Sequence, residues 1–200
     1  MRSFFEQFAH PEGSLGWLVG HLMAWKNGAR SRFALELVAA REGERVLEIG
    51  FGPGVDVARL AGLVGPTGNV AGVDVSREML RHAQSRNRAL VARGAVDLRL
   101  APATELPFAD ASFDAVCATN SAQFWRDLDQ GFCEIRRVLR AGGRAVVVVQ
   151  PMWKGATSSD AQDWSSRLRA SMRRSGLVEV THAERELRPV LTVAAVGRAA

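Results

Sequence analysis

A run of nine residues, VLEIGFGPG at positions 46–54, constrains the fold more than any other part of this sequence. It begins as an apolar strand, places glycine at positions 50, 52 and 54, and continues into an amphipathic helical pattern. Glycines at such a turn let the backbone turn sharply and approach a ligand closely, where a side chain would collide. The run therefore predicts a strand, a ligand-binding loop and a helix; a turn with spare glycines is the alternative interpretation.

The spacing of these glycines excludes two familiar phosphate-binding loops. A dinucleotide fingerprint, G-x-G-x-x-G, would need glycine at position 55, which is valine. A P-loop would need Lys followed by Ser or Thr, and neither follows here.

Strand and helix patterns alternate along the rest of the chain, which predicts an α/β fold with a mostly parallel sheet. Ser76 is the expected N-cap of a helix with an apolar stripe, and Gly142-Gly143 are expected to end the helix before the fifth strand. Four consecutive valines suit a strand that is buried on both faces. The expected strands are 45–49, 69–74, 96–100, 113–118, 145–149, 177–180 and 190–196, and the other helices are 55–63, 129–139 and 160–174.

Length and charge narrow the class of protein further. The 200 residues fit one domain, and the 26 basic and 21 acidic residues give a net charge of +5. The arginines are interleaved with acids at helical spacing, which is typical of solvated helix faces, and no recognisable nucleic-acid-binding signature accompanies them. We therefore expect no nucleic acid partner.

Two cysteines, Cys117 and Cys133, are too few for a disulfide framework or a zinc site, and we expect two core thiols. No cluster of residues suggests a metal. No apolar run approaches the roughly 18 residues of a membrane span, and the early Glu6 does not fit a signal peptide. These features predict a cytoplasmic chain.

The first 40 residues differ from the rest because they are rich in Phe, Trp and Leu before the first strand. Pro11 and Gly13 divide them into two helical pieces with more apolar area than one short helix can bury against a sheet. We expect residues 1–40 to form a helical lid over a pocket, and residues 41–200 to form the main domain.

The run EIGFGPG at 48–54 resembles motif I of the class I S-adenosylmethionine-dependent methyltransferases, E/D-x-G-x-G-x-G. The match continues in order through GVDVS at 72–76, LPF at 106–108, SFDAV at 112–116 and RVLRAGG at 137–143. Residues 13–27 are similar to small bacterial members that have a helical lid. The resemblance implies a Rossmann-like doubly wound sheet of about seven strands, mostly parallel with an antiparallel last strand, helices on both faces, and S-adenosylmethionine as cofactor.

The resemblance also assigns cofactor-binding roles. Asp74 would accept hydrogen bonds from the ribose hydroxyls, with a turn or cap role as the alternative. Glu48 would act near the sulfonium and amino end of the cofactor, with ordering of the loop as the alternative. Pro102 replaces the aspartate that often meets adenine in this family, so adenine would depend on the backbone of Ala103 and on apolar contacts such as Leu106. The other cofactor-binding residues expected from the resemblance are Gly50, Gly52, Gly54, Val75 and Asn120.

The acceptor site is expected at the carboxyl ends of strands one, four and five. The fourth strand ends in TNSAQFW at 119–125, which is not the Asn/Asp-Pro-Pro-aromatic motif of amino-methylating nucleic-acid enzymes. Asn120 and Gln123 are the residues expected to orient an acceptor, and His21 is the best candidate for a base, although a structural histidine is the alternative. The expected walls of the substrate pocket are Phe8, Trp17, Trp25, Phe124, Trp125 and Trp153.

The sequence thus predicts a methyltransferase that acts on a small-molecule acceptor under an aromatic N-terminal lid. A nucleic-acid or protein acceptor, or a non-catalytic protein that binds S-adenosylmethionine, are the alternatives. A homodimer remains an open alternative to a monomer.

Overall fold

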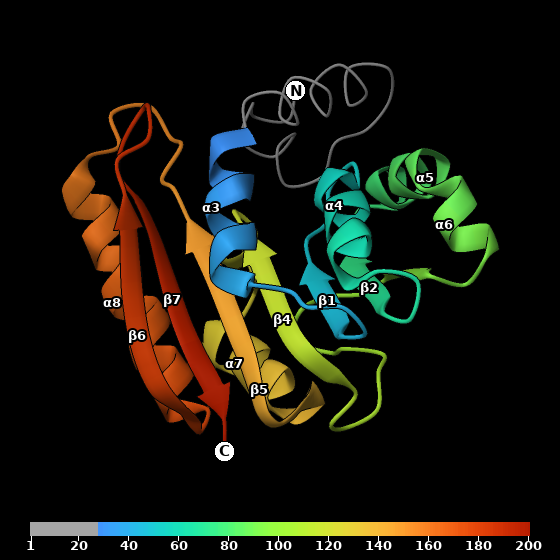
Figure 1. Cartoon of the computed structure of the whole chain (residues 1–200). Helices are drawn as coiled ribbons and strands as arrows, with labels where there is room; N and C mark the ends of the chain where they lie inside the picture. Colours follow the sequence, from blue (N-terminus) through green and yellow to red (C-terminus); the bar gives the residue numbers. More distant parts are fainter. Residues whose placement is uncertain (1–27) are drawn as a thin grey trace.

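A computed structural model of the chain describes residues 28–200, which form a seven-stranded sheet with helices on both faces (Figure 1). The strand order is β3-β2-β1-β4-β5-β7-β6. The strands are β1 (Arg45–Ile49), β2 (Asn69–Asp74), β3 (Val96–Leu100), β4 (Phe113–Thr119), β5 (Leu139–Val149), β6 (Leu177–Arg185) and β7 (Thr192–Ala199). The first five strands pair in parallel, whereas β7 is antiparallel to both β5 and β6. The predicted fold class is confirmed.

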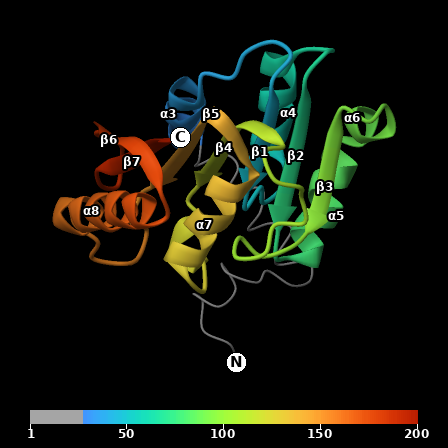
Figure 2. The same ribbon diagram turned by 90° about the horizontal axis from the view of Figure 1, so that it is seen from below.

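Helices cover both faces of this sheet. One face carries α3 (Gly28–Val38), α4 (Val55–Val64) and α5 (Arg77–Arg86); the other carries α7 (Leu128–Val138) and α8 (Ser158–Arg174) (Figure 2). The short α6 (Arg88–Ala92) and the 3-10 turn η1 (Ala122–Phe124) are the remaining helical elements of residues 28–200. The helix α3, which belongs to the expected 1–40 lid segment, lies against β4 and β5, while the division into a lid and a main domain stays a prediction.

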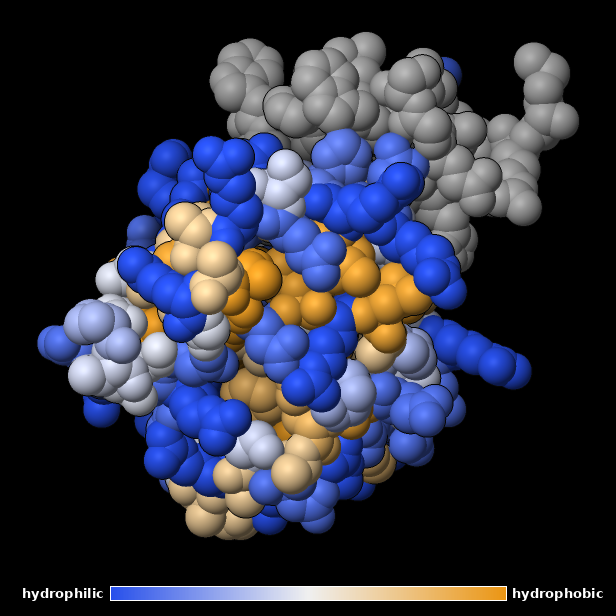
Figure 3. Space-filling view, turned by 90° about the vertical axis from the view of Figure 1, so that its right-hand side faces the viewer, coloured by the Kyte–Doolittle hydropathy of each residue, from blue (hydrophilic) through white to orange (hydrophobic). Residues whose placement is uncertain are grey.

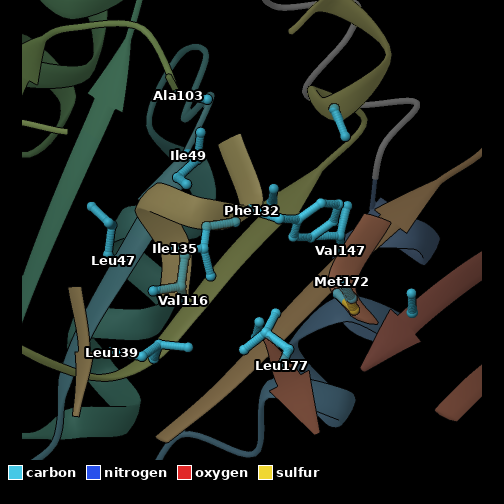
Figure 4. Packing of buried hydrophobic residues seen from close by; sticks show 14 of the residues in the cluster. Leu47, Ile49, Ala103, Val116, Phe132, Ile135, Leu139, Val147, Met172 and Leu177 are labelled. Carbon is cyan, nitrogen blue, oxygen red and sulfur yellow. The ribbon is translucent and has the colours of Figure 1, made fainter. Parts of the chain in front are cut away.

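Alternation of side chains along the strands builds one apolar core on each face. In the valine run of β5, Val146 and Val148 face α3, and Val147 and Val149 face α7 and α8. Figure 4 shows the second core, in which Phe132 and Ile135 of α7 point onto the sheet beside Leu47 and Ile49 of β1. The expectation that this strand is buried on both faces is confirmed.

The end of α7 differs from its prediction. Gly142-Gly143 do not end the helix: α7 stops at Val138, and Leu139 already has extended backbone angles and pairs with Phe113 as the first residue of β5. The two glycines lie inside β5, where the register shifts between Phe113 and Ala115. Gly142 has a left-handed φ of 74°, so the glycines form an irregularity in the strand rather than a helix stop.

Two further details correct or refine the sequence analysis. Cys117 is buried as expected, but Cys133 is exposed on the outer face of α7, so only one thiol belongs to the core. Ser76 caps α5 as predicted, since its hydroxyl accepts a hydrogen bond from the Met79 N–H. The helix that it begins ends at Arg86, and residues 88–92 form the separate helix α6. Within residues 28–200, no helix has both the length and the apolar character needed to cross a bilayer.

Candidate functional site

A cavity of about 340 Å³ opens at the carboxyl ends of the parallel strands, around the point where the strand order reverses between β1 and β4. Open α/β sheets bind their ligands in this crevice, because successive loops diverge there. The described residues that line it are Ile49, Gly50, Gly52, Pro53, Val73, Asp74, Val75, Ser76, Met79, Ala101, Pro102, Ala103, Thr104, Asn120, Ser121, Phe124, Trp125 and Arg126.

The three glycines after β1 all have left-handed backbone angles but face different surroundings. A Cβ on Gly50 would lie 2.3 Å from the Cβ of Ser121, whose hydroxyl donates to the Ile49 carbonyl at 2.7 Å. A Cβ on Gly54 would lie 2.7 Å from the Cβ of Ala83 on α5. At Gly52, by contrast, a Cβ would meet nothing within 4 Å. Two glycines therefore allow protein packing, and Gly52 faces open space in the cavity.

Asp74 connects the end of β2 to the glycine loop. Its Oδ2 accepts a hydrogen bond from the Gly52 N–H at 2.9 Å, and its Oδ1 accepts one from the Ser76 N–H at 2.8 Å. A carboxylate offers about four lone-pair positions, so these two bonds leave room for further donors. Both interpretations of Asp74 made from the sequence are thus compatible with its position: it orders the turn, and it faces the cavity.

Glu48 lies on the opposite side of β1 from the cavity wall. It is 5% exposed, its Oε2 has no hydrogen-bond partner among the described residues, and it does not line the cavity. Burial raises the pKa of this carboxyl well above its ordinary value, and the nearby charges of Asp56 and Asp74 raise it further. The structure therefore places Glu48 under the loop, and its predicted contact with the cofactor stays a prediction.

The loop after β3 supplies a mostly apolar wall. Ala101, Pro102, Ala103 and Thr104 line the cavity, and Val75 faces them from the turn after β2. Figure 3 shows apolar residues reaching the surface on the side of the molecule that carries α5 and α6. Leu106, expected beside adenine, is instead buried in the core and does not line the cavity.

Asn120 begins the loop after β4 in a left-handed conformation, with a φ of 52°. Its side-chain Oδ1 accepts a hydrogen bond from the Gln150 N–H at 2.7 Å, which ties the ends of β4 and β5 together. Phe124 and Trp125 also line the cavity; Phe124 is half exposed, and Trp125 packs edge-on against Phe132.

Other predicted acceptor residues are placed differently. Gln123 does not line the cavity, although its Oε1 is buried without a hydrogen-bond partner among the described residues. Trp153 is exposed beyond the end of β5 and is also not part of the wall. His21, Phe8, Trp17 and Trp25 lie outside the described residues.

Three residues that the sequence analysis gave no role hold the site together. Ser121 packs against Gly50, and the side-chain amide of Asn87 donates to the Gly54 carbonyl at 2.9 Å. The buried Gln150 accepts from Arg30 of α3 and donates to carbonyls of the β6–β7 loop at Leu187 and Val190. For Gln150, the sequence signal is an amide that directly follows a strand of buried valines. The roles of Ser121 and Asn87 depend on contacts with residues distant in sequence. In the described part of the chain, no group of three or more His, Cys, Asp or Glu residues is arranged to hold a metal.

Comparisons with known proteins agree with this geometry. A family model described as "Methyltransferase domain" matches residues 47–147, which include both the glycine loop and β4. The chain is 25% identical over 181 residues to the uncharacterized methyltransferase YdaC of Bacillus subtilis, covering 90% of this chain and 97% of that protein. It is 36% identical over 117 residues to the ubiquinone/menaquinone biosynthesis C-methyltransferase UbiE of Pseudomonas entomophila, covering 58% of this chain and 46% of UbiE. The chain thus spans half the length or less of most of the curated relatives considered, YdaC excepted.

Among solved structures, an S-adenosylmethionine-dependent methyltransferase from Aquifex aeolicus has the same fold, with a TM-score of 0.73 and 17% identity over 90% of this chain and 97% of that one. The family match covers half of the chain and contains the predicted cofactor loop. The chain therefore belongs to the methyltransferase-domain family, the class I S-adenosylmethionine-dependent methyltransferases.

Proposed function

We propose that this chain transfers the methyl group of S-adenosylmethionine to a small-molecule acceptor in the cavity at the carboxyl ends of β1, β2 and β4. The observation that carries the proposal is the pairing of Gly52 with Asp74. The Gly52 N–H is held by the Asp74 carboxylate, and a Cβ at Gly52 would project into open space in the cavity. A polar ligand can therefore lie directly against the main chain at this position.

The residues around the cavity fit the three parts of this cofactor. The carboxylate of Asp74 suits the two ribose hydroxyls, because hydrogen bonds to a charged acceptor are strong. The wall formed by Val75 and Ala101–Thr104 suits the flat face of adenine. The methionine part would extend along Gly50 and Gly52 toward Asn120. Val75, Ala103 and Asn120 line the cavity and keep the cofactor-binding roles proposed from the sequence, whereas Gly54 would support the site through its packing against α5.

When bound, the sulfonium supplies an activated methyl group, and the protein has to align an acceptor with it and exclude water. Phe124 and Trp125 offer apolar surface for this purpose, and the Asn120 amide can hydrogen-bond to an acceptor at the ends of β4 and β5. Alignment can accelerate the transfer without a dedicated base. If a base is used, His21 is the candidate, and Gln123 is a candidate for orienting the acceptor.

The acceptor that these walls favour is apolar or contains an aromatic ring. Phe124 is 53% exposed and Trp125 is adjacent to it, so a hydrophobic acceptor would cover surface that otherwise faces water. Relatives such as UbiE, whose name refers to ubiquinone and menaquinone biosynthesis, support a small-molecule acceptor. Trp153, which lies outside the cavity wall, is proposed to contact the acceptor from beyond the end of β5.

Residues 1–27 complete the proposal as an aromatic lid, with Phe8, Trp17 and Trp25 as acceptor contacts. A version of the chain that begins at Gly28 should keep cofactor binding but lose most methyl transfer, since closure and alignment provide the acceleration. If the same residues instead fill the core, the shortened chain will not fold, and circular dichroism will show it.

The test is transfer of tritium from labelled S-adenosylmethionine in an unfractionated cell lysate, with the Asp74→Ala variant as the control. Labelled product of low molecular mass supports the proposal. Label in RNA or protein would establish a macromolecular acceptor instead, and cofactor binding without any labelled product would indicate a non-catalytic binding protein.

A further inference from the structure

The loop between β3 and β4 carries one wall of the cavity but has no regular secondary structure from Ala101 to Ser112. Backbone hydrogen bonds tie it down near its two ends, from the Ala101 N–H to the Asp74 carbonyl and from the Ser112 N–H to the Val138 carbonyl. Between these ends, Arg99 of β3 donates to the Pro107 carbonyl at 2.6 Å, and side chains of α7 hold the residues on either side of Pro107.

Glu134 and Arg137 of α7 form hydrogen bonds with the backbone in the middle of this loop. Glu134 Oε2 accepts a hydrogen bond from the Leu106 N–H at 2.7 Å, and Arg137 Nη2 donates to the Leu106 carbonyl at 2.9 Å. Arg137 Nη1 also donates to the Phe108 carbonyl at 2.7 Å. Both backbone groups of Leu106 are therefore held by one pair of side chains, only two residues beyond Thr104 of the cavity wall.

This pair is coupled by charge as well as by geometry. Arg137 Nε lies 2.7 Å from Glu134 Oε1, and their side chains are only 31% and 14% exposed. The hydrogen bonds from Arg137 lower the pKa of the Glu134 carboxyl, so Glu134 stays ionised and continues to accept from Leu106. Arg137 Nη1 also donates to Asp110 Oδ1 at 2.8 Å, so the guanidinium binds two carboxylates and two carbonyls at once. Lysine cannot reproduce this fork of donors.

We propose that Arg137, acting with Glu134, is a positioning residue for cofactor binding: it holds the β3–β4 loop so that Ala101–Thr104 form the wall of the cavity. The inference rests on the proposed function, because that wall is where the adenine of S-adenosylmethionine would lie. When a loop occupies its binding-competent position for only part of the time, the apparent dissociation constant rises in inverse proportion to that fraction.

The chain contains a matched control for this role. Arg144 also binds a glutamate, Glu44, with its two terminal nitrogens at 2.9 and 2.6 Å, and it donates to two backbone carbonyls, those of Val38 and Ala39. Its side chain and that of Glu44 are 15% and 13% exposed. This second pair lies where β1 begins, at the end of the sheet opposite the cavity, so breaking it costs stability without touching the cavity wall.

The experiment is titration calorimetry of the full chain with S-adenosylhomocysteine, well below the unfolding midpoint of each variant. We expect Arg137→Met to raise the dissociation constant about tenfold and Arg137→Lys to raise it less, because lysine keeps the charge and loses the fork. Arg144→Met should change the dissociation constant by less than about twofold, although it should lower the unfolding midpoint as much as Arg137→Met does.

The outcomes separate the two proposals. If the unaltered chain does not bind S-adenosylhomocysteine, the proposed function fails. If it binds, and Arg137→Met binds equally well or loses no more affinity than Arg144→Met, the positioning role of Arg137 is overturned. Should Arg137→Met fail to fold, Arg137→Lys and Glu134→Gln decide the matter, since unchanged affinity in both would overturn the role.

Discussion

Replacing the glycines of the β1–α4 loop by alanine, one at a time, should separate the residues that serve the fold from the one that serves the ligand. All three have positive φ angles, 79° at Gly50, 52° at Gly52 and 73° at Gly54. An alanine in this region costs about 1–2 kcal/mol of folding free energy, because its Cβ approaches the following carbonyl oxygen. That conformational cost is common to the three variants.

The surroundings of each glycine determine the rest of the loss in the free energy of unfolding. A new Cβ at Gly50 or Gly54 would lie 2.3 or 2.7 Å from a neighbouring Cβ, so the strand ends or α5 must shift. Such overpacking adds about 1–3 kcal/mol. Gly50→Ala and Gly54→Ala should therefore lower the free energy of unfolding by about 2–5 kcal/mol, and Gly52→Ala by only about 1–2 kcal/mol.

Binding should follow the reverse order. The Cβ of Gly52→Ala projects into open space in the cavity, so this variant should be the most stable of the three and should have the weakest affinity relative to its stability. Gly52→Val, with two more methyl groups, should abolish binding while helix content is kept. Urea unfolding gives the stabilities, and calorimetry with S-adenosylhomocysteine gives the affinities.

A second substitution tests the packing account directly. Combining Gly50→Ala with Ser121→Gly removes the colliding Cβ, so the double variant should lose less stability than the sum of the two single variants. Additive losses would refute the proposed contact. Undiminished affinity in folded Gly52→Ala and Gly52→Val would show that the loop is only a turn.

Three further predictions concern the carboxylates and the proline of the site. Asp74→Ala should weaken S-adenosylhomocysteine binding at least tenfold, because a hydrogen bond to a charged group contributes about 1.5–3 kcal/mol. It should also lower the free energy of unfolding, because the Gly52 N–H loses its acceptor. Unchanged affinity in calorimetry would remove Asp74 from the ribose site. Glu48 has a raised pKa in the folded state, so the native protein binds more protons than the unfolded chain, and the free energy of unfolding should fall as the pH rises from about 4.5 until the raised pKa is passed. Glu48→Gln should flatten this part of the profile in urea unfolding at several pH values, and an identical profile would contradict the assignment. Pro102→Asp should raise the affinity for S-adenosylhomocysteine relative to its inosine analogue, because a carboxylate can accept from the adenine amine and not from a 6-oxo group; an unchanged ratio would place adenine elsewhere.

The strands could be predicted from the sequence because each is a short apolar or alternating run bounded by polar residues. The ends of the helices were harder. At Leu139, the helix gives way to a strand without any turn residue, because pairing with Phe113 determines the backbone there. The break at Asn87 likewise depends on the Gly54 carbonyl that its side chain binds, 33 residues earlier in the chain. Both are tertiary effects that local patterns do not contain.

The same distinction applies to the candidate site. The glycine loop and Asp74 were found because they form a contiguous motif at the ends of neighbouring strands. Successive side chains of a strand point to opposite faces of the sheet. Because Ile49 lines the cavity, Glu48 points to the other face of β1. The attachment of the β3–β4 loop by Arg137 was missed because its partners lie about 30 residues before it in the chain.

The strand order has a consequence for how this chain is made. The strand β7 is synthesised after β6, yet it lies between β5 and β6 and is antiparallel to both. Until residues 192–199 have left the ribosome, β5 has an unpaired edge and β6 has no place in the sheet. Exposed edges of this kind pair readily with other chains. A chain that lacks residues 192–199 should therefore aggregate more than the full chain.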